Sequence, residues 1–212
     1  MIINILVDNK DSWMIPYAQE LVNDLQKDHQ VNFVYDQADL ISGDFAVFLS
    51  CGKIIAAENL KKNKHNLVVH ESYLPQGKGM SPLTWQILEK KNDIPITLFE
   101  AAEKVDSGDV YAQEVMHFDG HELVDELRKE QGKKTISMVK ELVSRPLPLI
   151  GKKQEGPESF YPRRRPQDSE LDINKSIADQ FDLLRVADNE RYPAFFNHRG
   201  HKYLIKIYKS EL

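Results

Sequence analysis

The sequence has a single cysteine, Cys51, in 212 residues, so no intramolecular disulfide can form. This cysteine content is typical of a reducing compartment, and we expect Cys51 to be buried and inert. No apolar run approaches the roughly 18 residues that a membrane-spanning helix needs. The amino terminus shows no basic leader with a small-residue cleavage site, so we expect no signal peptide. We therefore predict a cytoplasmic protein without a membrane partner.

A basic surplus is also missing, because 28 Lys and Arg residues stand against 33 Asp and Glu residues, a formal net charge of −5. General nucleic-acid binders usually carry a basic excess, so we expect no nucleic-acid partner. The remaining composition is ordinary for a globular protein, with 41% hydrophobic and 29% charged residues. The length permits one full domain and an appendage.

Short apolar runs alternate with helical patterns over the first 150 residues. Apolar and β-branched runs predict strands at 2–7, 31–35, 45–49, 67–70, 96–99 and 110–115. Apolar residues at helical spacing predict helices at 15–25, 81–90 and 121–143, the first capped by Asp11 or Ser12. Such alternation implies an α/β fold with a mostly parallel sheet and helices on both faces. Ligands bind beyond the carboxyl ends of the strands in these sheets, so we expect the chemistry just after Leu49, Val69 and Phe99.

The composition changes after Val143, where proline and glycine become frequent. We therefore predict a first domain over residues 1–150 and a second part over residues 151–212. The second part is expected to hold a linker, a helix at 173–186 and a β-hairpin that turns at 197–200. About 60 residues bury too little core to fold alone, so we expect this part to dock on the first domain. An exposed hairpin edge could also join two copies in a homodimer.

The densest group of polar residues follows the strand at 67–70. His70 ends this strand, where a neutral imidazole can exchange protons near pH 7. Lys78 lies between two glycines in the next loop, and glycines let the backbone approach a ligand closely. Asp106 lies in a second loop and could orient or deprotonate His70. Both features also have a plainer interpretation, namely a histidine bonded to backbone and an ordinary Asp-x-Gly turn.

Other polar clusters are less specific. His198 and His201 have no acidic or cysteine partner nearby in the sequence, so we expect no metal site. The three arginines at 163–165 could clamp a phosphate bidentately or form a solvated cluster. The loop around Lys78 lacks the Walker A spacing, and no Gly-x-Gly-x-x-Gly follows the first strand. A standard dinucleotide site is therefore not expected.

Taken together, these residues resemble a known family. The pattern His-x-Ser-x-Leu-Pro-x-x-Lys-Gly from His70, with Asp106 of Val-Asp-Ser-Gly-Asp 36 residues later, resembles the formyltransferases that use 10-formyltetrahydrofolate. The resemblance is specific between residues 45 and 115 and continues in the segment at 163–169 and in the predicted helix and hairpin beyond it. It implies a Rossmann-like α/β fold and formyl transfer to an amine, with 10-formyltetrahydrofolate as donor and no metal.

The resemblance also implies roles for single residues. Family members hold the formyl group between an Asn, a His and an Asp, and His70 and Asp106 match the last two as catalytic residues. Val68 stands in the place of the Asn and cannot donate a hydrogen bond. Asn66 lies roughly 13 Å from His70 along the strand, too far to replace it. Either Ser72 or a backbone N–H supplies the missing donor, or the enzyme is slow or altered, since losing one such donor costs about 100- to 1,000-fold in rate.

The same resemblance places the folate against two loops. The first loop contributes Gly52, Lys53 and Ile54. The second loop precedes Asp106 and runs from Ala102 to Val105. These are the cofactor-binding residues that the resemblance implies.

The expected acceptor is a nucleotide-linked amino-dideoxy sugar destined for surface polysaccharide. Lys78, Arg163 and Arg164 are candidates for binding its phosphates, and Trp85 for stacking on its base. Methionyl-tRNA and glycinamide ribonucleotide are alternative acceptors. A non-catalytic protein that binds folate or a nucleotide sugar is a further alternative, because Val68 could mark a lapsed active site.

Overall fold

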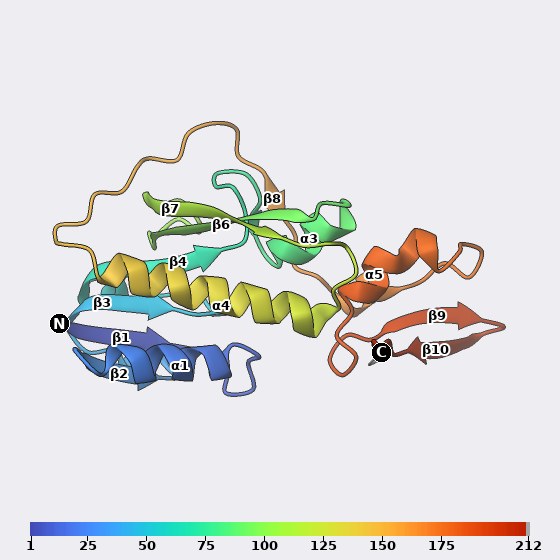
Figure 1. The fold of residues 1–212 in the computed structure, drawn as a ribbon, viewed down its shortest axis with the longest axis horizontal. Helices are drawn as coiled ribbons and strands as arrows, with labels where there is room; N and C mark the ends of the chain where they lie inside the picture. The colour runs from blue at the N-terminus through green and yellow to red at the C-terminus, as the bar shows by residue number, and fades with distance from the viewer. Residues whose placement is uncertain (211–212) are drawn as a thin grey trace.

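A six-stranded sheet forms the centre of the molecule in a computed structural model that describes residues 1–210 (Figure 1). Its strands follow the order β2-β1-β3-β4-β6-β7. Their bounds are β1 (Ile2–Leu6), β2 (Gln30–Val34), β3 (Gly43–Phe48), β4 (Asn63–His70), β6 (Asp93–Glu100) and β7 (Val110–His117). The first four of these strands in the sheet are parallel, whereas β6 is antiparallel to β4 and β7 to β6. The predicted Rossmann-like, mostly parallel α/β fold is confirmed.

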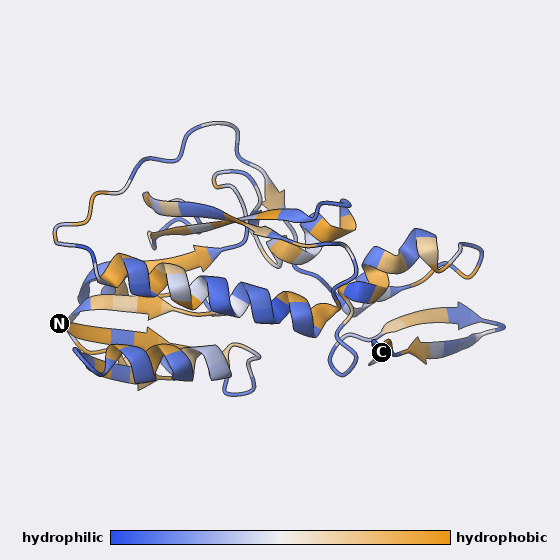
Figure 2. Ribbon diagram, in the orientation of Figure 1, coloured by the Kyte–Doolittle hydropathy of each residue, from blue (hydrophilic) through white to orange (hydrophobic). Residues whose placement is uncertain are grey.

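Two long helices cover one face of the sheet, α1 (Ile15–Leu25) and α4 (Val124–Val143). The strands are largely hydrophobic because this face and the opposite one are both covered, while much of the outer side of α4 is hydrophilic (Figure 2). Gly132 interrupts the apolar stripe of α4 for a packing reason, since a Cβ there would lie 2.6 Å from the ring of Tyr17. The predicted cap of α1 is wrong: Met14 occupies the N-cap position, and no side chain caps the helix.

The opposite face of the sheet carries a smaller apolar cluster and shorter cover. The 3₁₀ helix η1 (Gln37–Asp39), the short α2 (Ala57–Leu60) and neighbouring loops lie over it. Its buried members are Leu6, Val34, Leu40, Ala46 and Phe48. Helices therefore lie on both faces, but only the face with α1 and α4 carries long ones.

One part of the predicted topology is wrong. Because β6 is antiparallel to β4, His70 pairs with Thr97, and Glu100 pairs with Leu67 further back along β4. The chain after Phe99 therefore leaves the sheet away from the edge that His70 occupies. The loop at 101–109 has to return toward this edge for Asp106 to approach His70.

After α4 the chain runs back past β7, the edge strand of the sheet, as the long loop in Figure 1 shows, and Lys152 bridges to Val110 at the start of β7. It forms the two-residue strand β8 (Phe160–Tyr161), which pairs in parallel with β5 (Lys78–Gly79) beside α3 (Pro82–Leu88). Neither β5 nor β8 was predicted. Within residues 1–210, no helix is both long and apolar enough to cross a lipid bilayer.

The C-terminal elements are η2 (Pro166–Ser169), η3 (Ala178–Gln180), α5 (Phe181–Arg185) and the hairpin of β9 (Ala194–His198) and β10 (His201–Ile205). The predicted helix at 173–186 begins only at 178, because Ile173 and Ile177 find no core and remain exposed. The C-terminal elements form a small apolar cluster that includes Leu171, Leu184 and Ala194.

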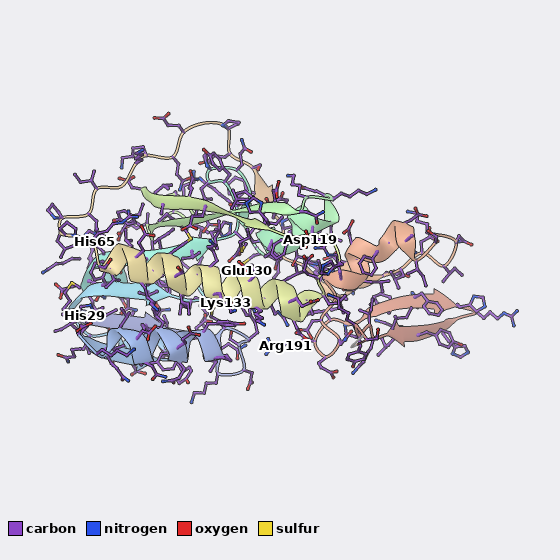
Figure 3. The ribbon with its side chains drawn as sticks, viewed as in Figure 1. His29, His65, Asp119, Glu130, Lys133 and Arg191 are labelled. Carbon is purple, nitrogen blue, oxygen red and sulfur yellow. The ribbon has the colours of Figure 1, made fainter. Side chains whose placement is uncertain are left out.

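Polar contacts attach these elements to the body of the protein. Buried Arg185 donates to Asn92 Oδ1 at 3.0 Å and to Glu122 Oε2 at 3.1 Å. Arg191, labelled in Figure 3, donates to the carbonyl oxygen of Asp11 in the loop before α1. The division of the chain at residue 150 stays a prediction.

Candidate active site

His70 ends β4 with its ring almost fully buried. Its Nε2 lies 2.9 Å from the carbonyl oxygen of Gly77. A carbonyl oxygen can only accept, so this ring nitrogen carries a proton and donates it. Asp106 Oδ2 lies 3.8 Å from the same nitrogen. The structure therefore brings together the two residues that the sequence predicted to be catalytic.

Asp106 is held at this edge by its own loop. Its backbone takes the left-handed conformation at φ +51°, which Asp tolerates better than most residues. Its Oδ2 accepts a hydrogen bond from Gly79 N–H at 2.8 Å, and its carbonyl accepts one from Gln154 Nε2 at 3.0 Å. Gly108 lets the loop close on β6, because a Cβ there would lie 1.7 Å from the carbonyl oxygen of Glu100. The Asp-x-Gly pattern thus serves both the turn and the placing of the carboxylate.

The residue in place of the family's Asn packs as an apolar side chain. Val68 joins the cluster on the second face of the sheet, beside Cys51 and Ala101. Asn66 Nδ2 donates to the carbonyl oxygen of Leu60 at 2.9 Å, whereas its Oδ1 has no partner among residues 1–210. Ser72 is buried, and its Oγ has no hydrogen-bond partner among residues 1–210. Its hydroxyl is therefore not used by any hydrogen bond within the described chain.

The two loops expected to bind folate border the same apolar cluster as Val68. Asp8 Oδ2 accepts from the backbone N–H groups of Gly52 and Lys53, both at 2.8 Å, and so fixes the first loop. Ile54 is exposed in the first loop, as are Ala102 and Val105 in the second. These apolar side chains and fixed backbone groups fit a flat, largely apolar ring system with polar edges. Their folate-binding roles stay predictions.

Lys78 lies deeper than a surface phosphate ligand. Its side chain is 1% exposed, and its Nζ lies 2.6 Å from Glu158 Oε1. Lys104 of the second loop reaches the same Glu158 oxygen at 3.2 Å. Hydrogen bonds from these two lysines lower the pKa of Glu158 below its usual range, and the bond from Lys78 has the larger effect. Phosphate binding by Lys78 stays a prediction.

Residues 152–161, here called the crossing segment, connect the loop that contains Gly77 with the loop that contains Asp106 and Gly108. Ser159 Oγ accepts a hydrogen bond from the backbone N–H of Gly77 at 2.8 Å. The carbonyl oxygen of the same residue, Gly77, accepts from His70. Gln154 Nε2 also donates to the Gly108 carbonyl oxygen at 2.9 Å. Sequence reasoning missed both residues, because a proline- and glycine-rich stretch about 50 and 80 residues from its partners gives no local signal.

The remaining predicted substrate residues follow the crossing segment. The indole of Trp85 donates to the Pro162 carbonyl oxygen at 2.8 Å and stacks on Tyr161. Arg163 is exposed, whereas Arg164 donates to the Asp168 carbonyl oxygen at 2.9 Å. Trp85 and Arg164 thus already have partners in the chain. All substrate roles of these residues stay predictions.

Glu71, which directly follows His70, was not singled out from the sequence. Its Oε1 accepts from Gln131 Nε2 of α4 at 2.7 Å. Burial raises the pKa of this carboxyl above its usual range. A second acidic group therefore lies beside the candidate catalytic pair.

In the part of the chain that the structure describes, one cluster of residues could ligate a metal: Asp119, His121 and Glu122, with ligand atoms within 4.8 Å of one another. Lys209 Nζ lies 3.0 Å from His121 Nδ1, which places a positive charge beside the cluster. Asp119 and His121 are exposed, and Figure 3 labels Asp119 near the C-terminal elements rather than at the loops of the candidate site. The cluster carries no metal assignment.

Comparison with known proteins gives one family. A family model described as formyl transferase matches residues 14–142. The matched region contains His70, Asp106 and both loops around them.

Solved structures share the fold over nearly the whole chain. A methionyl-tRNA formyltransferase from Clostridium thermocellum has a TM-score of 0.83 and 21% identity, covering 99% of this chain and 93% of its own. A sugar N-formyltransferase from a Shewanella species has a TM-score of 0.72 and 15% identity, covering 100% and 99%. HypX from Aquifex aeolicus, solved with tetrahydrofolic acid, has a TM-score of 0.71 and 18% identity, covering 97% of this chain but 37% of its own. At these identities the structures establish the fold alone.

Proposed function

The chain belongs to the formyl transferase family, and from this premise we propose that it moves a formyl group from 10-formyltetrahydrofolate to the amine of a nucleotide-linked amino-dideoxy sugar. Formyl transfer follows from the family, whereas the donor and acceptor are the proposal. The approach of Asp106 Oδ2 to His70 Nε2, at 3.8 Å on the sheet edge, is the observation that carries it.

Three observations support this donor and acceptor. HypX, which shares the fold, was solved with tetrahydrofolic acid. The likeness to a sugar N-formyltransferase spans both chains almost completely, and the net charge of −5 disfavours a polyanionic acceptor. Methionyl-tRNA remains the second candidate acceptor, because the likeness to a methionyl-tRNA formyltransferase is equally extensive.

The site residues can divide the reaction between them. The donor supplies an activated formyl carbon, which the acceptor amine attacks. His70 carries a proton on Nε2, which it donates to the Gly77 carbonyl oxygen in the free protein. Turning this N–H toward the formyl oxygen would stabilise the negative charge that develops there. Asp106 can orient His70 and accept a proton from the attacking nitrogen. Ser72, two residues after His70, has a hydroxyl without a hydrogen-bond partner and is a candidate for a further donor.

Mass spectrometry of reaction mixtures tests the proposal. Each mixture holds the protein, 10-formyltetrahydrofolate and one acceptor from a panel of UDP- and dTDP-linked 3-amino and 4-amino dideoxy sugars, with methionyl-tRNA as a separate arm. We expect a sugar product heavier by one formyl group, with at least about 1,000-fold less product for His70→Ala and Asp106→Asn. Folate binding by both variants, measured by fluorescence quenching, is expected to persist.

Other outcomes would point elsewhere. Formylated methionyl-tRNA without any sugar product would replace the proposed acceptor. Folate or nucleotide-sugar binding without product from any acceptor would identify a non-catalytic binding protein. The homodimer and the cytoplasmic location stay predictions.

A further inference from the structure

The carboxylate of Glu71 is only half satisfied in the free protein. Gln131 Nε2 holds its Oε1 at 2.7 Å, whereas Oε2 has no side-chain hydrogen-bond partner and no ion pair among residues 1–210. A partly buried carboxylate normally has a cation or several donors around it. One oxygen of Glu71 is therefore available to a ligand, and a cation is the ligand it favours.

Glu71 and His70 face opposite sides of the same sheet edge. Val68 packs in the cluster on the second face, and His70, two residues later, points the same way. Val69 packs against the cluster beneath α1 and α4, and Glu71 reaches Gln131 on that side. The loops expected to bind folate border the second face. The side of α4 is thus left for the acceptor.

The surroundings of Glu71 favour a carboxyl that exchanges protons. Burial is the main cause of its raised pKa, nearby His70 opposes it, and the charge of Asp106 adds to it. The neutral amide of Gln131 meets the carboxyl from α4, and that of Gln86 in α3 donates to the Glu71 carbonyl oxygen at 2.6 Å. A general base works best when its pKa lies close to the operating pH.

We propose that Glu71 is a further catalytic residue, whose free Oε2 binds the protonated amine of the acceptor and removes the proton that blocks its attack. The inference rests on the formyl transfer proposed above. An alkyl ammonium ion has no lone pair, and most of the amine is in this form at neutral pH.

The proton balance assigns separate tasks to the two carboxylates. Glu71 takes one N–H proton from the ammonium ion and, as a carboxylic acid, releases it to solvent. The nitrogen lone pair then forms the bond to the formyl carbon, and the bond from that carbon to the folate nitrogen breaks. The second N–H proton passes through Asp106 and His70 to the folate nitrogen. One proton therefore reaches solvent for each formyl group transferred.

The variant Glu71→Gln separates this role from a structural one. Its amide oxygen can still accept from Gln131, so the link to α4 is kept while the negative charge is lost. A purely structural role predicts little change in activity. Glu20→Gln is the matched control, because Glu20 is exposed on α1 and has no ion pair among residues 1–210.

We would measure kcat/KM for the wild type and each variant from about pH 5.5 to 9 with the acceptor that gives product. At pH 7 we expect Glu71→Gln to lose about 100-fold in kcat/KM and Glu20→Gln to match the wild type. The loss should shrink as pH rises, because the amine then deprotonates without help. Tm at pH 8 should equal or exceed that of the wild type, because an unpaired, partly buried charge is gone. Glu71→Asp, which keeps the charge, should recover part of the activity.

Calorimetry with an amino sugar nucleotide and its hydroxyl analogue gives a test without turnover. The wild type should bind the amine at least about 10-fold more tightly than the hydroxyl analogue, and Glu71→Gln should lose this preference. If Glu71→Gln keeps the pH profile of the wild type, or keeps the preference for the amine over the hydroxyl analogue, the proposed role of Glu71 is overturned while the proposed function stands. A wild type that neither binds nor formylates any amino sugar overturns the proposed function first, and the role of Glu71 with it.

Discussion

At the level of single side chains, the neighbours of His70 differ in what they can give to a formyl oxygen. Val68 is apolar and packs in a cluster, while buried Ser72 has a hydroxyl without a partner. Two hydrogen bonds fix the backbone of Ser72. Its N–H donates to the His70 carbonyl oxygen at 2.9 Å, and its carbonyl oxygen accepts from Thr97 Oγ1 at 2.7 Å. The hydroxyl is thus a positioned donor that the fold itself does not use.

Ser72→Ala tests this interpretation. If the hydroxyl replaces the missing amide, kcat falls by about 100-fold or more. Tm should hold or rise slightly, since no hydrogen bond is lost and a buried polar atom is removed. The measurement is steady-state formyl transfer together with thermal unfolding, with exposed Ser144→Ala as control. An unchanged kcat would assign the role to a backbone N–H instead.

At the level of elements, the crossing segment decides how the two loops of the site are held. β8 pairs with β5, and Gln154, Glu158 and Ser159 reach from it to residues of both loops. Glu158 neutralises Lys78, which is buried and has no other carboxylate partner among residues 1–210. The segment therefore belongs structurally to the candidate active site, although it lies about 50 to 80 residues after its partners there.

The lowered pKa of Glu158 gives a pH prediction. A carboxyl whose pKa falls on folding stabilises the fold above its ordinary pKa and loses this contribution as pH drops through the lowered value. We therefore expect Glu158→Gln to have a lower Tm than the wild type at neutral pH. The gap should persist through the ordinary glutamate range and close only below it. Thermal unfolding over a pH series measures this, and because Glu158 is solvent-accessible, high salt should narrow the gap.

At the level of the whole molecule, one buried arginine connects the C-terminal elements to the sheet domain. The Arg185 guanidinium contacts Glu122, Asn92 and Asp182, and its side chain is 1% exposed. The next residue, Val186, lies in the main apolar core. The helix α5 is therefore anchored by both charge and packing.

Arg185→Ala should cost about 3 to 5 kcal/mol of unfolding free energy, because it leaves a partly buried Glu122 without its cation. Urea unfolding measures the loss, and limited proteolysis should show faster cleavage between residues 151 and 170. Arg145→Ala removes an exposed arginine from an i,i+4 pair and should change stability by less than about 0.5 kcal/mol. Equal losses for both variants would contradict an anchoring role for Arg185.

The sequence by itself determined the local structure and the candidate pair. Continuous apolar runs predicted the strands, helical spacing predicted α1 and α4, and the patterns around His70 and Asp106 identified residues that the fold does place together. These features depend on contacts between near neighbours or on short motifs. The two failures have different causes. The N-cap of α1 is Met14 rather than a polar side chain. The helix predicted at 173–186 starts late because Ile173 and Ile177 find no core to pack against.

Only the tertiary structure decided which distant residues complete the site. Contacts between segments far apart in the chain decide the antiparallel orientation of β6 and the pairing of β5 with β8. They also decide which residues Lys78 and Glu71 contact. The sequence around a residue does not indicate which distant residue it will contact. Whether Lys78 meets solvent or Glu158, and whether Glu71 lacks a cation, follows from burial and neighbouring charge, which exist only once the chain has folded.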